Sequence, residues 1–135
     1  MITKAKFVSI NISDYDRALE FYRDKLGFEV LVDAPYGEEM GGQVGGRWIQ
    51  VGPKGADTSV HLQAAEPDAV GGWASVVFDS DDIVATCEAL KANGVEVTQD
   101  AEEASWGWWA QFKDPDGNEF GLGQSGDERT RAAER

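Results

Sequence analysis

Residues 13–28 read Ser13-Asp14-Tyr15-Asp16-Arg17-Ala18-Leu19-Glu20-Phe21-Tyr22-Arg23-Asp24-Lys25-Leu26-Gly27-Phe28. Apolar side chains recur in this stretch at helical spacing, at Ala18, Phe21, Tyr22 and Leu26. Ser13 stands at the position of an N-cap, and Asp16 three residues later echoes a capping box. Gly27 is the residue type expected just after a last helical turn. The stretch therefore predicts an amphipathic helix that begins at Ser13 and ends before Gly27.

Segments typical of strands lie on both sides of this helix. In residues 7–12, apolar Val8, Ile10 and Ile12 alternate with a second set of side chains, which is the period of a strand. After the helix, a glycine-rich loop is expected at residues 35–46. The further strands are expected at residues 28–32, 47–51 and 59–63.

The same plan recurs later in the chain. Ser13-Asp14 returns as Ser80-Asp81, and Gly27-Phe28-Glu29-Val30 returns as Gly94-Val95-Glu96-Val97 at the same offset. A second helix is expected at about residues 81–93, and the remaining polar segment between residues 98 and 108 is expected to be a loop. The second set of strands is expected at residues 73–78, 95–98, 108–112 and 119–122. The sequence thus predicts an α+β chain built from a duplicated β-α-β-β-β unit.

The expected organisation is a single domain over residues 1–124. Module one covers about residues 5–65, a Pro- and Gly-containing linker covers residues 66–72, and module two covers about residues 73–124. Residues 125–135 are charged and lack large apolar anchors, so a disordered tail is expected there.

Composition excludes several classes of function. The 135 residues carry 12 Lys and Arg against 25 Asp and Glu, a formal net charge of −13, which disfavours binding to nucleic acid. No apolar run approaches the ~20 residues needed to span a membrane, and no signal peptide is visible at the N-terminus. Cys87 is the single cysteine, so no internal disulfide can form, which favours a cytoplasmic protein.

The alternation of the strands points to a candidate site. When the aliphatic positions of each strand are assigned to the helix side of the sheet, the opposite positions combine aromatic and small polar side chains. Such a set suits a ligand cavity, and the alternatives are a dimer interface or a second layer of core. The set consists of Phe7, Ser9, Asn11, Trp48, Gln50, Ser59, His61, Gln63, Trp73, Ser75, Trp109, Gln111, Gly121 and Gly123.

His61 is the single histidine and the one candidate catalytic residue. It could act as a general base, or it could only hydrogen-bond a ligand or a neighbour. We find no Cys/His nucleophile arrangement, no phosphate-binding loop and no metal-spaced Cys or His cluster. The glycines at residues 41–46 are interpreted as a lip beside the site, and Cys87 as a small core residue.

Two motifs resemble the vicinal oxygen chelate superfamily, the group of glyoxalases, bleomycin-resistance proteins and extradiol dioxygenases. The first is the stretch from Ser13 to Phe28, and the second is Phe112-Lys113-Asp114-Pro115-Asp116-Gly117-Asn118-Glu119-Phe120. The resemblance covers about residues 5–124. It implies two β-α-β-β-β modules that form a cupped mixed sheet with helices on its outer face, commonly in homodimers.

The resemblance also implies where metal-dependent members place their ligands. Those four positions fall here on Phe7, His61, Ser75 (with Trp73 one inward step earlier) and Gly121. Only His61 offers a good donor, whereas zinc, iron and nickel sites need about three protein ligands. We therefore expect no metal and no cofactor.

The leading hypothesis is a metal-free binding protein of the bleomycin-resistance type. It would sequester an aromatic or hydrophobic molecule, such as an antibiotic, in a Trp-lined cavity. The first alternative is a metal-free isomerase or lyase in which His61 transfers a proton. The others are a metal-dependent glyoxalase or dioxygenase, and a non-catalytic module that binds protein and has no small-molecule pocket.

Overall fold

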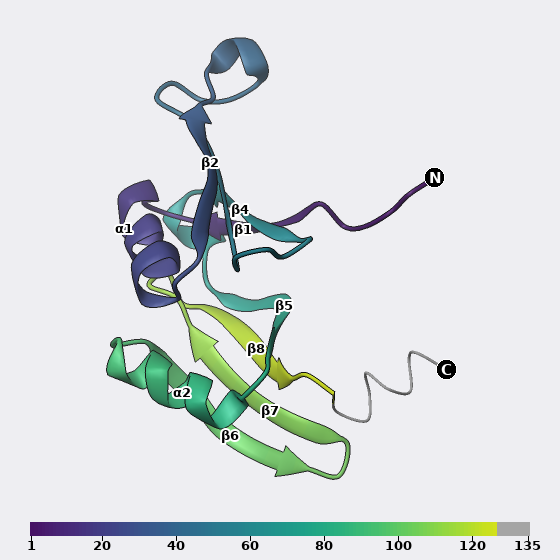
Figure 1. Cartoon of the computed structure of the whole chain (residues 1–135). Helices are drawn as coiled ribbons and strands as arrows, with labels where there is room; N and C mark the ends of the chain where they lie inside the picture. The colour runs from purple at the N-terminus through teal and green to yellow at the C-terminus, as the bar shows by residue number, and fades with distance from the viewer. Residues whose placement is uncertain (127–135) are drawn as a thin grey trace. The chain divides into compact units, whose positions relative to one another are not determined.

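The computed structural model describes residues 1–126, and the chain divides into two compact units between Val70 and Gly71. In chain order (Figure 1), the first unit contains β1 (Phe7–Ile12), α1 (Tyr15–Leu19), η1 (Glu20–Lys25), β2 (Glu29–Pro35), η2 (Glu38–Met40), β3 (Arg47–Gly52), β4 (Ser59–Ala64) and η3 (Pro67–Ala69). The second unit contains β5 (Gly72–Ser80), α2 (Ile83–Ala92), β6 (Glu96–Ala104), β7 (Gly107–Lys113) and β8 (Asn118–Gln124).

Each unit holds one four-stranded mixed sheet with the same topology. The strand orders are β1-β4-β3-β2 and β5-β8-β7-β6. The first strand of each unit pairs in parallel with the last, and the other pairs are antiparallel. The α+β class and the tandem β-α-β-β-β modules predicted from the sequence are therefore confirmed.

A helical segment covers one face of each sheet. In the first unit, α1 and η1 lie against β3 and β4, and in the second α2 lies along β6 and β7 (Figure 1). The aliphatic parity of the strands meets these helices, as the alternation predicts. The buried apolar side chains of the first unit are Ile10, Ile12, Ala18, Leu19, Phe21, Tyr22, Ile49, Val51, Val60 and Leu62. Those of the second are Ile83, Cys87, Leu90, Val95, Ala110, Phe112, Phe120 and Leu122.

The first helix begins one residue later than the sequence suggested. Asp14, not Ser13, is the N-cap, because its Oδ1 accepts a hydrogen bond of 2.9 Å from the backbone N–H of Arg17. The Ser13 hydroxyl instead accepts from the Arg17 guanidinium. From Glu20 the helix continues as the π-helical turn η1, which buries Phe21 and Tyr22 together.

Two other elements differ from the expected bounds. The segment expected as a polar loop after residue 98 continues β6 to Ala104, since its register with β7 extends to the Ala104–Gly107 pair. β2 covers Glu29–Pro35 rather than residues 28–32, and a bulge lies between Val30 and Val32.

The segment from Asp114 to Asn118 closes the β7–β8 hairpin. One oxygen of the buried Asp114 carboxylate accepts from the backbone N–H groups of Asp116 and Asn118, at 3.0 and 2.9 Å, and the other accepts from the Asn118 side chain at 2.8 Å. Asn118 Oδ1 in turn accepts from the backbone N–H of Gly71 at the start of the second unit. The turn motif therefore has a structural role.

Among residues 1–126, no helix is long and apolar enough to cross a membrane. The predicted charged tail lies outside the described residues, except for Ser125 and Gly126.

Candidate functional site

The first unit brings together six of the predicted site residues on the sheet face opposite its helix. Phe7 and Ser9 come from β1, Trp48 and Gln50 from β3, and Ser59 and His61 from β4. Because β1 runs parallel to β4, Ser9 lies directly beside His61, and on its other side His61 lies opposite Gln50.

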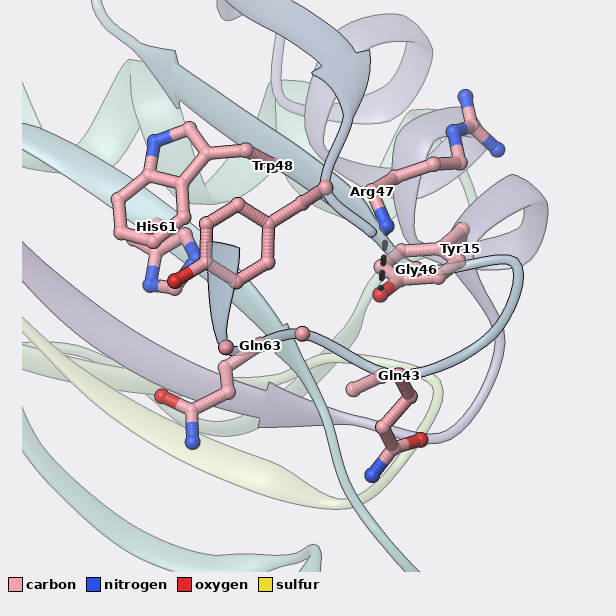
Figure 2. A pocket seen from close by; sticks show the side chains of 11 residues that line it. Tyr15, Gln43, Gly46, Arg47, Trp48, His61 and Gln63 are labelled. Atoms are coloured by element: carbon pink, nitrogen blue, oxygen red, sulfur yellow. Dashed lines mark hydrogen bonds between the residues drawn. The ribbon is translucent and has the colours of Figure 1, made fainter. Parts of the chain in front are cut away.

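An aromatic stack forms the centre of this face. The Trp48 indole lies over the His61 imidazole with ring centroids 3.9 Å apart and planes 19° from parallel (Figure 2). Phe7 presents its edge to both rings, with centroids 5.7 Å from Trp48 and 5.5 Å from His61. Tyr36 lies 5.3 Å from Trp48 at a tilt of 54°. Four aromatic rings thus hold one another in fixed orientations.

His61 is buried and hydrogen-bonded. Its Nδ1 and the Ser9 hydroxyl are 3.0 Å apart, and the hydroxyl can donate or accept according to the imidazole tautomer. Burial lowers the pKa of His61 below its ordinary value, so the imidazole is neutral near pH 7. A neutral imidazole can accept or donate one hydrogen bond at Nε2, or accept a proton there.

A chain of polar side chains fixes the Trp48 indole from the edge. Trp48 Nε1 donates to Gln50 Oε1 at 2.8 Å, Gln50 Nε2 donates to the Ser59 hydroxyl at 3.0 Å, and that hydroxyl donates to the Lys6 carbonyl at 3.4 Å. The second unit repeats the first link, because Trp109 Nε1 donates to Gln111 Oε1 at 3.0 Å. Gln50, Ser59 and Gln111 therefore act as supports for the two indoles.

A cavity of about 290 Å³ opens beside the Trp48–His61 stack (Figure 2). Three of its lining residues, Trp48, His61 and Gln63, were predicted from strand alternation. The expected glycine lip does contribute to the wall. The remaining lining residues are Tyr15, Tyr36, Gly41, Gly42, Gln43, Gly46, Arg47 and Ala64.

The positive charge in the wall is compensated locally. Arg47 forms a two-pronged ion pair with Asp33, at 2.7 and 3.1 Å, and a second ion pair of 3.1 Å with Asp16. The guanidinium holds the pKa of the Asp33 carboxyl below its usual range. Figure 2 shows it directed away from Trp48 and His61. The cavity thus combines aromatic surface with the neutral carboxamides of Gln43 and Gln63, and it offers little to an anion.

Tyr15, Tyr36, Gln43 and Arg47 were missed because they do not follow strand alternation. Tyr15 lies in the first turn of α1, and its hydroxyl accepts from the backbone N–H of Arg47 at 3.2 Å (Figure 2). Tyr36 closes the base of the glycine-rich loop, because its N–H donates to the Gly46 carbonyl at 2.8 Å. The sequence did hold a signal for the two tyrosines, because Tyr15 lies at the start of the expected helix and Tyr36 at the start of the expected loop.

Other predicted site residues have different surroundings. Asn11 donates to the Ala69 carbonyl at 3.2 Å and so ties β1 to the segment after β4. In the second unit, Trp109 lies 6.3 Å from Trp73, and its ring covers Gly121, where a Cβ atom would come within 2.3 Å of the indole.

Ser75 does not occupy the position expected from the alternation. It has a φ of +59°, and the register between β5 and β8 shifts between Trp73 and Val77. Val77, rather than Ser75, is the register partner of Gly121. The bulge therefore breaks the alternation that had placed Trp73 and Ser75 on one face.

The residues present do not fit a divalent metal centre. Phe7, Trp73 and Gly121 have no donor atom suited to a metal, and the Trp109 ring fills the space beside Gly121. No group of three or more His, Cys, Asp or Glu side chains within residues 1–126 could hold a metal ion.

Comparison with known proteins identifies a family whose model matches this chain. The family model described as Glyoxalase/Bleomycin resistance protein/Dioxygenase superfamily matches residues 4–122. The crystal structure of TnmS3, an antibiotic binding protein from Streptomyces sp. CB03234, is similar with a TM-score of 0.77 and 38% sequence identity. The match covers 91% of this chain and 96% of that one.

Two curated proteins illustrate the spread of relatives. The uncharacterized protein YetH of Bacillus subtilis is 36% identical over 122 residues, which are 89% of this chain and 97% of YetH. The lactoylglutathione lyase of Haemophilus influenzae is 31% identical over 119 residues, which are 80% of this chain and 82% of that protein.

Proposed function

The chain belongs to the Glyoxalase/Bleomycin resistance protein/Dioxygenase superfamily, and from this membership we propose that it is a small-molecule binding protein of the bleomycin-resistance type. It holds an aromatic or hydrophobic ligand, such as an antibiotic, without altering it. The similarity to an antibiotic binding protein at 38% identity supports this class of function.

The observation that carries the proposal is the cavity beside the Trp48–His61 stack. A planar ligand gains stacking and edge contacts from Tyr36 and Trp48, whose orientations are already fixed, so little side-chain entropy is lost on binding. Gln43, Gln63 and neutral His61 offer hydrogen bonds that orient such a ligand. A module that binds only protein does not require such a cavity.

The experiment is a titration of the full chain with bleomycin and a panel of planar polycyclic antibiotics, followed by calorimetry. Trp48→Phe is expected to weaken binding of a ligand that occupies the cavity by about tenfold, because it shortens the stacking surface and removes the bond to Gln50. Trp108→Phe is the matched control, since Trp108 does not line the cavity. Equal weakening by both variants would remove the cavity as the site.

The second candidate is a metal-free isomerase or lyase that uses His61. It is favoured by one observation, a neutral imidazole in the cavity wall whose Nδ1 is held by Ser9. Mass spectrometry of each bound compound distinguishes the two candidates, because a binding protein returns it unchanged. If a compound is converted, His61→Ala should abolish turnover while binding persists. Unchanged turnover in that variant would exclude His61 as the proton-transfer group.

Two further assignments belong to the same proposal. A free, buried Cys87 is compatible with the reducing cytoplasm, where we place the protein. We also expect a homodimer, which sedimentation equilibrium of the full chain tests directly.

A further inference from the structure

A group of charged side chains lies at the base of the loop that forms the lip. This loop, residues 36–46, is here called the lip loop; it leaves β2 after Pro35 and enters β3 at Arg47, and these two residues are register partners. Tyr36 and Gly46 close its base through their backbone hydrogen bond of 2.8 Å. Five of the eleven residues that line the cavity belong to this loop. Its position therefore sets the shape of one cavity wall.

The lip loop has little stiffness of its own. Residues 41–46 include four glycines, whose backbone has more accessible conformations than that of other residues. The hydrogen bonds within the loop are local, such as those from the Gly42 N–H to the Gly37 carbonyl and from the Gly46 N–H to the Gln43 carbonyl. These bonds hold the loop's own shape but not its direction relative to the sheet. The direction depends on contacts at the base.

Arg47 connects three elements at this base. Its guanidinium forms the two-pronged ion pair with Asp33 of β2, at 2.7 and 3.1 Å, and the ion pair of 3.1 Å with Asp16 of α1. It also lies 5.4 Å from the centroid of the Tyr15 ring, whose hydroxyl accepts from the Arg47 backbone N–H. A two-pronged bond fixes the orientation of its partners as well as their distance. β2, β3 and α1 are thus held together where the lip loop begins and ends.

The pair between Arg47 and Asp33 is the stronger of the two ion pairs. The side chains of Arg47 and Asp33 are 29% and 35% exposed, whereas that of Asp16 is 89% exposed. Solvent and salt screen a partly shielded pair less than an exposed one. Asp33 is therefore the main partner through which Arg47 can hold the loop.

Arg47 influences the cavity without pointing into it. Figure 2 shows the guanidinium directed away from Trp48 and His61. The side chains that the lip loop brings to the cavity are those of Tyr36, whose ring lies 5.3 Å from that of Trp48, and Gln43. Any effect of the ion pair on a bound molecule must therefore pass through the loop.

We propose that Arg47 is a positioning residue: its two-pronged pair with Asp33 holds the lip loop beside Trp48. Tyr36 and Gln43 line the cavity while the loop keeps this position. Without the pair, the loop must be ordered during binding, and the entropy lost in ordering it lowers the affinity. The effect on affinity rests on the function proposed above, whereas the effect on the loop does not.

The test compares two matched variants, Asp33→Asn and Asp24→Asn. Each replaces a carboxylate that accepts two hydrogen bonds from one guanidinium, because Asp24 accepts from Arg23 at 2.9 and 3.0 Å. Asp24 belongs to η1 and does not line the cavity. The two variants therefore differ in whether the lost ion pair lies at the base of the lip loop.

The first measurements use the full chain without ligand. Asp33→Asn is expected to lower the protection of the Tyr36 amide from hydrogen exchange about three- to fivefold, and to weaken the NMR cross-peaks between the Tyr36 and Trp48 rings. Asp24→Asn should leave both unchanged. Asp33→Glu, which keeps the carboxylate, should recover part of the loss. A pair that contributes only to global stability would leave the cross-peaks of the folded chain unaltered.

The affinity is measured with doxorubicin, a planar polycyclic antibiotic. Asp33→Asn is expected to raise its Kd about three- to fivefold, and Asp24→Asn to leave it unchanged. In a Tyr36→Ala background the same substitution should have a smaller effect, because the ring that the loop positions is gone. If the wild-type chain binds neither doxorubicin nor any other antibiotic of the panel, the proposed function fails, while hydrogen exchange and the cross-peaks still decide the role of Arg47.

Two results in the ligand-free chain would overturn the proposal. One is an Asp33→Asn variant in which the Tyr36 amide and the cross-peaks to Trp48 are unchanged, and the other is an equal response in Asp24→Asn. With doxorubicin bound, an unchanged Kd in Asp33→Asn despite a disordered lip loop would also overturn it, because the loop would then not position the cavity wall.

Discussion

At the scale of single residues, Gly121 leaves room for an aromatic side chain from the neighbouring strand. The Trp109 ring lies against the glycine so closely that a Cβ atom would come within 2.3 Å of the indole. The absence of a side chain at residue 121 therefore gives the Trp109 ring its place against β8.

Gly121→Ala is expected to lower the free energy of unfolding by about 1–3 kcal/mol, because the new methyl group must displace a packed indole. Urea denaturation followed by circular dichroism measures the change. Gly123→Ala is the matched control on the same strand and face, since its Cβ meets only Asp79 Oδ1 at 4.0 Å. It should be neutral or slightly stabilising, because alanine restricts the unfolded chain.

A double variant tests whether the stability lost in Gly121→Ala comes from the contact with the Trp109 ring. In a Trp109→Phe background the smaller ring leaves room for the methyl group, so Gly121→Ala should cost much less than in the wild-type chain. An equal cost in both backgrounds would show that the strain comes from elsewhere.

His61 predicts a pH dependence of stability. Burial lowers its pKa in the folded state, so at mildly acidic pH the unfolded state binds more protons than the folded state. The stability contributed by His61 is therefore complete above its ordinary pKa of about 6.5 and is lost as the pH falls through the lower folded value. The slope from this one group cannot exceed about 1.4 kcal/mol per pH unit.

Urea denaturation between pH 7.5 and 5 tests this expectation against His61→Gln. Because the chain has a single histidine, the variant should show a much flatter profile in this interval than the wild-type chain. A profile equally steep in both proteins, or a wild-type chain that gains stability in acid, would contradict the assignment.

At the scale of elements, substitutions at the start of α1 distinguish the observed N-cap, Asp14, from the N-cap expected from the sequence, Ser13. Asp14→Ala removes the acceptor for the Arg17 N–H and should cost about 1 kcal/mol of unfolding free energy. Ser13→Ala removes the exposed bond to the Arg17 guanidinium and should cost less than about 0.5 kcal/mol. Asp14→Asn keeps a capping oxygen and should recover most of the loss. A larger effect at Ser13 would restore the sequence-based assignment.

Strand alternation assigned side chains to the face of the sheet where they are observed wherever a strand pairs regularly. Trp48 and His61 were placed on one face from parity alone, and their stack follows from the regular register between β3 and β4. Parity failed in β5, because the extra residues of the bulge around Ser75 lie outside any period of two.

The periodicity of the strands could not predict the rest of the cavity wall. Tyr36 and Gln43 belong to a loop whose shape depends on backbone hydrogen bonds such as that between Tyr36 and Gly46. A glycine-rich composition indicates a turn but not its direction. The sequence therefore predicted that residues 41–46 form a lip beside the site, but it did not predict that Tyr36 lines the cavity.

At the scale of the whole molecule, charge is distributed unevenly between the two units. Residues 1–70 carry eleven acidic residues and seven Lys and Arg, whereas residues 71–126 carry eleven acidic residues and two Lys. The net charge of −13 thus resides mainly in the second unit. Self-repulsion of that unit should oppose its folding at low ionic strength.

Sodium chloride should therefore stabilise the protein, and the second unit more than the first. Raising the salt from about 0.01 to 1 M shortens the Debye length from about 30 to 3 Å, which screens repulsion between surface carboxylates. We expect a gain of about 1 kcal/mol in unfolding free energy, comparable to removing a few weak surface interactions. Hydrogen exchange locates the gain, which should be larger for amides of β6 and α2 than for those of β3 and β4. Sucrose at matched osmolality controls for general exclusion effects, and it should protect both units alike. Equal protection of both units by salt would mean that the uneven charge has no influence on stability.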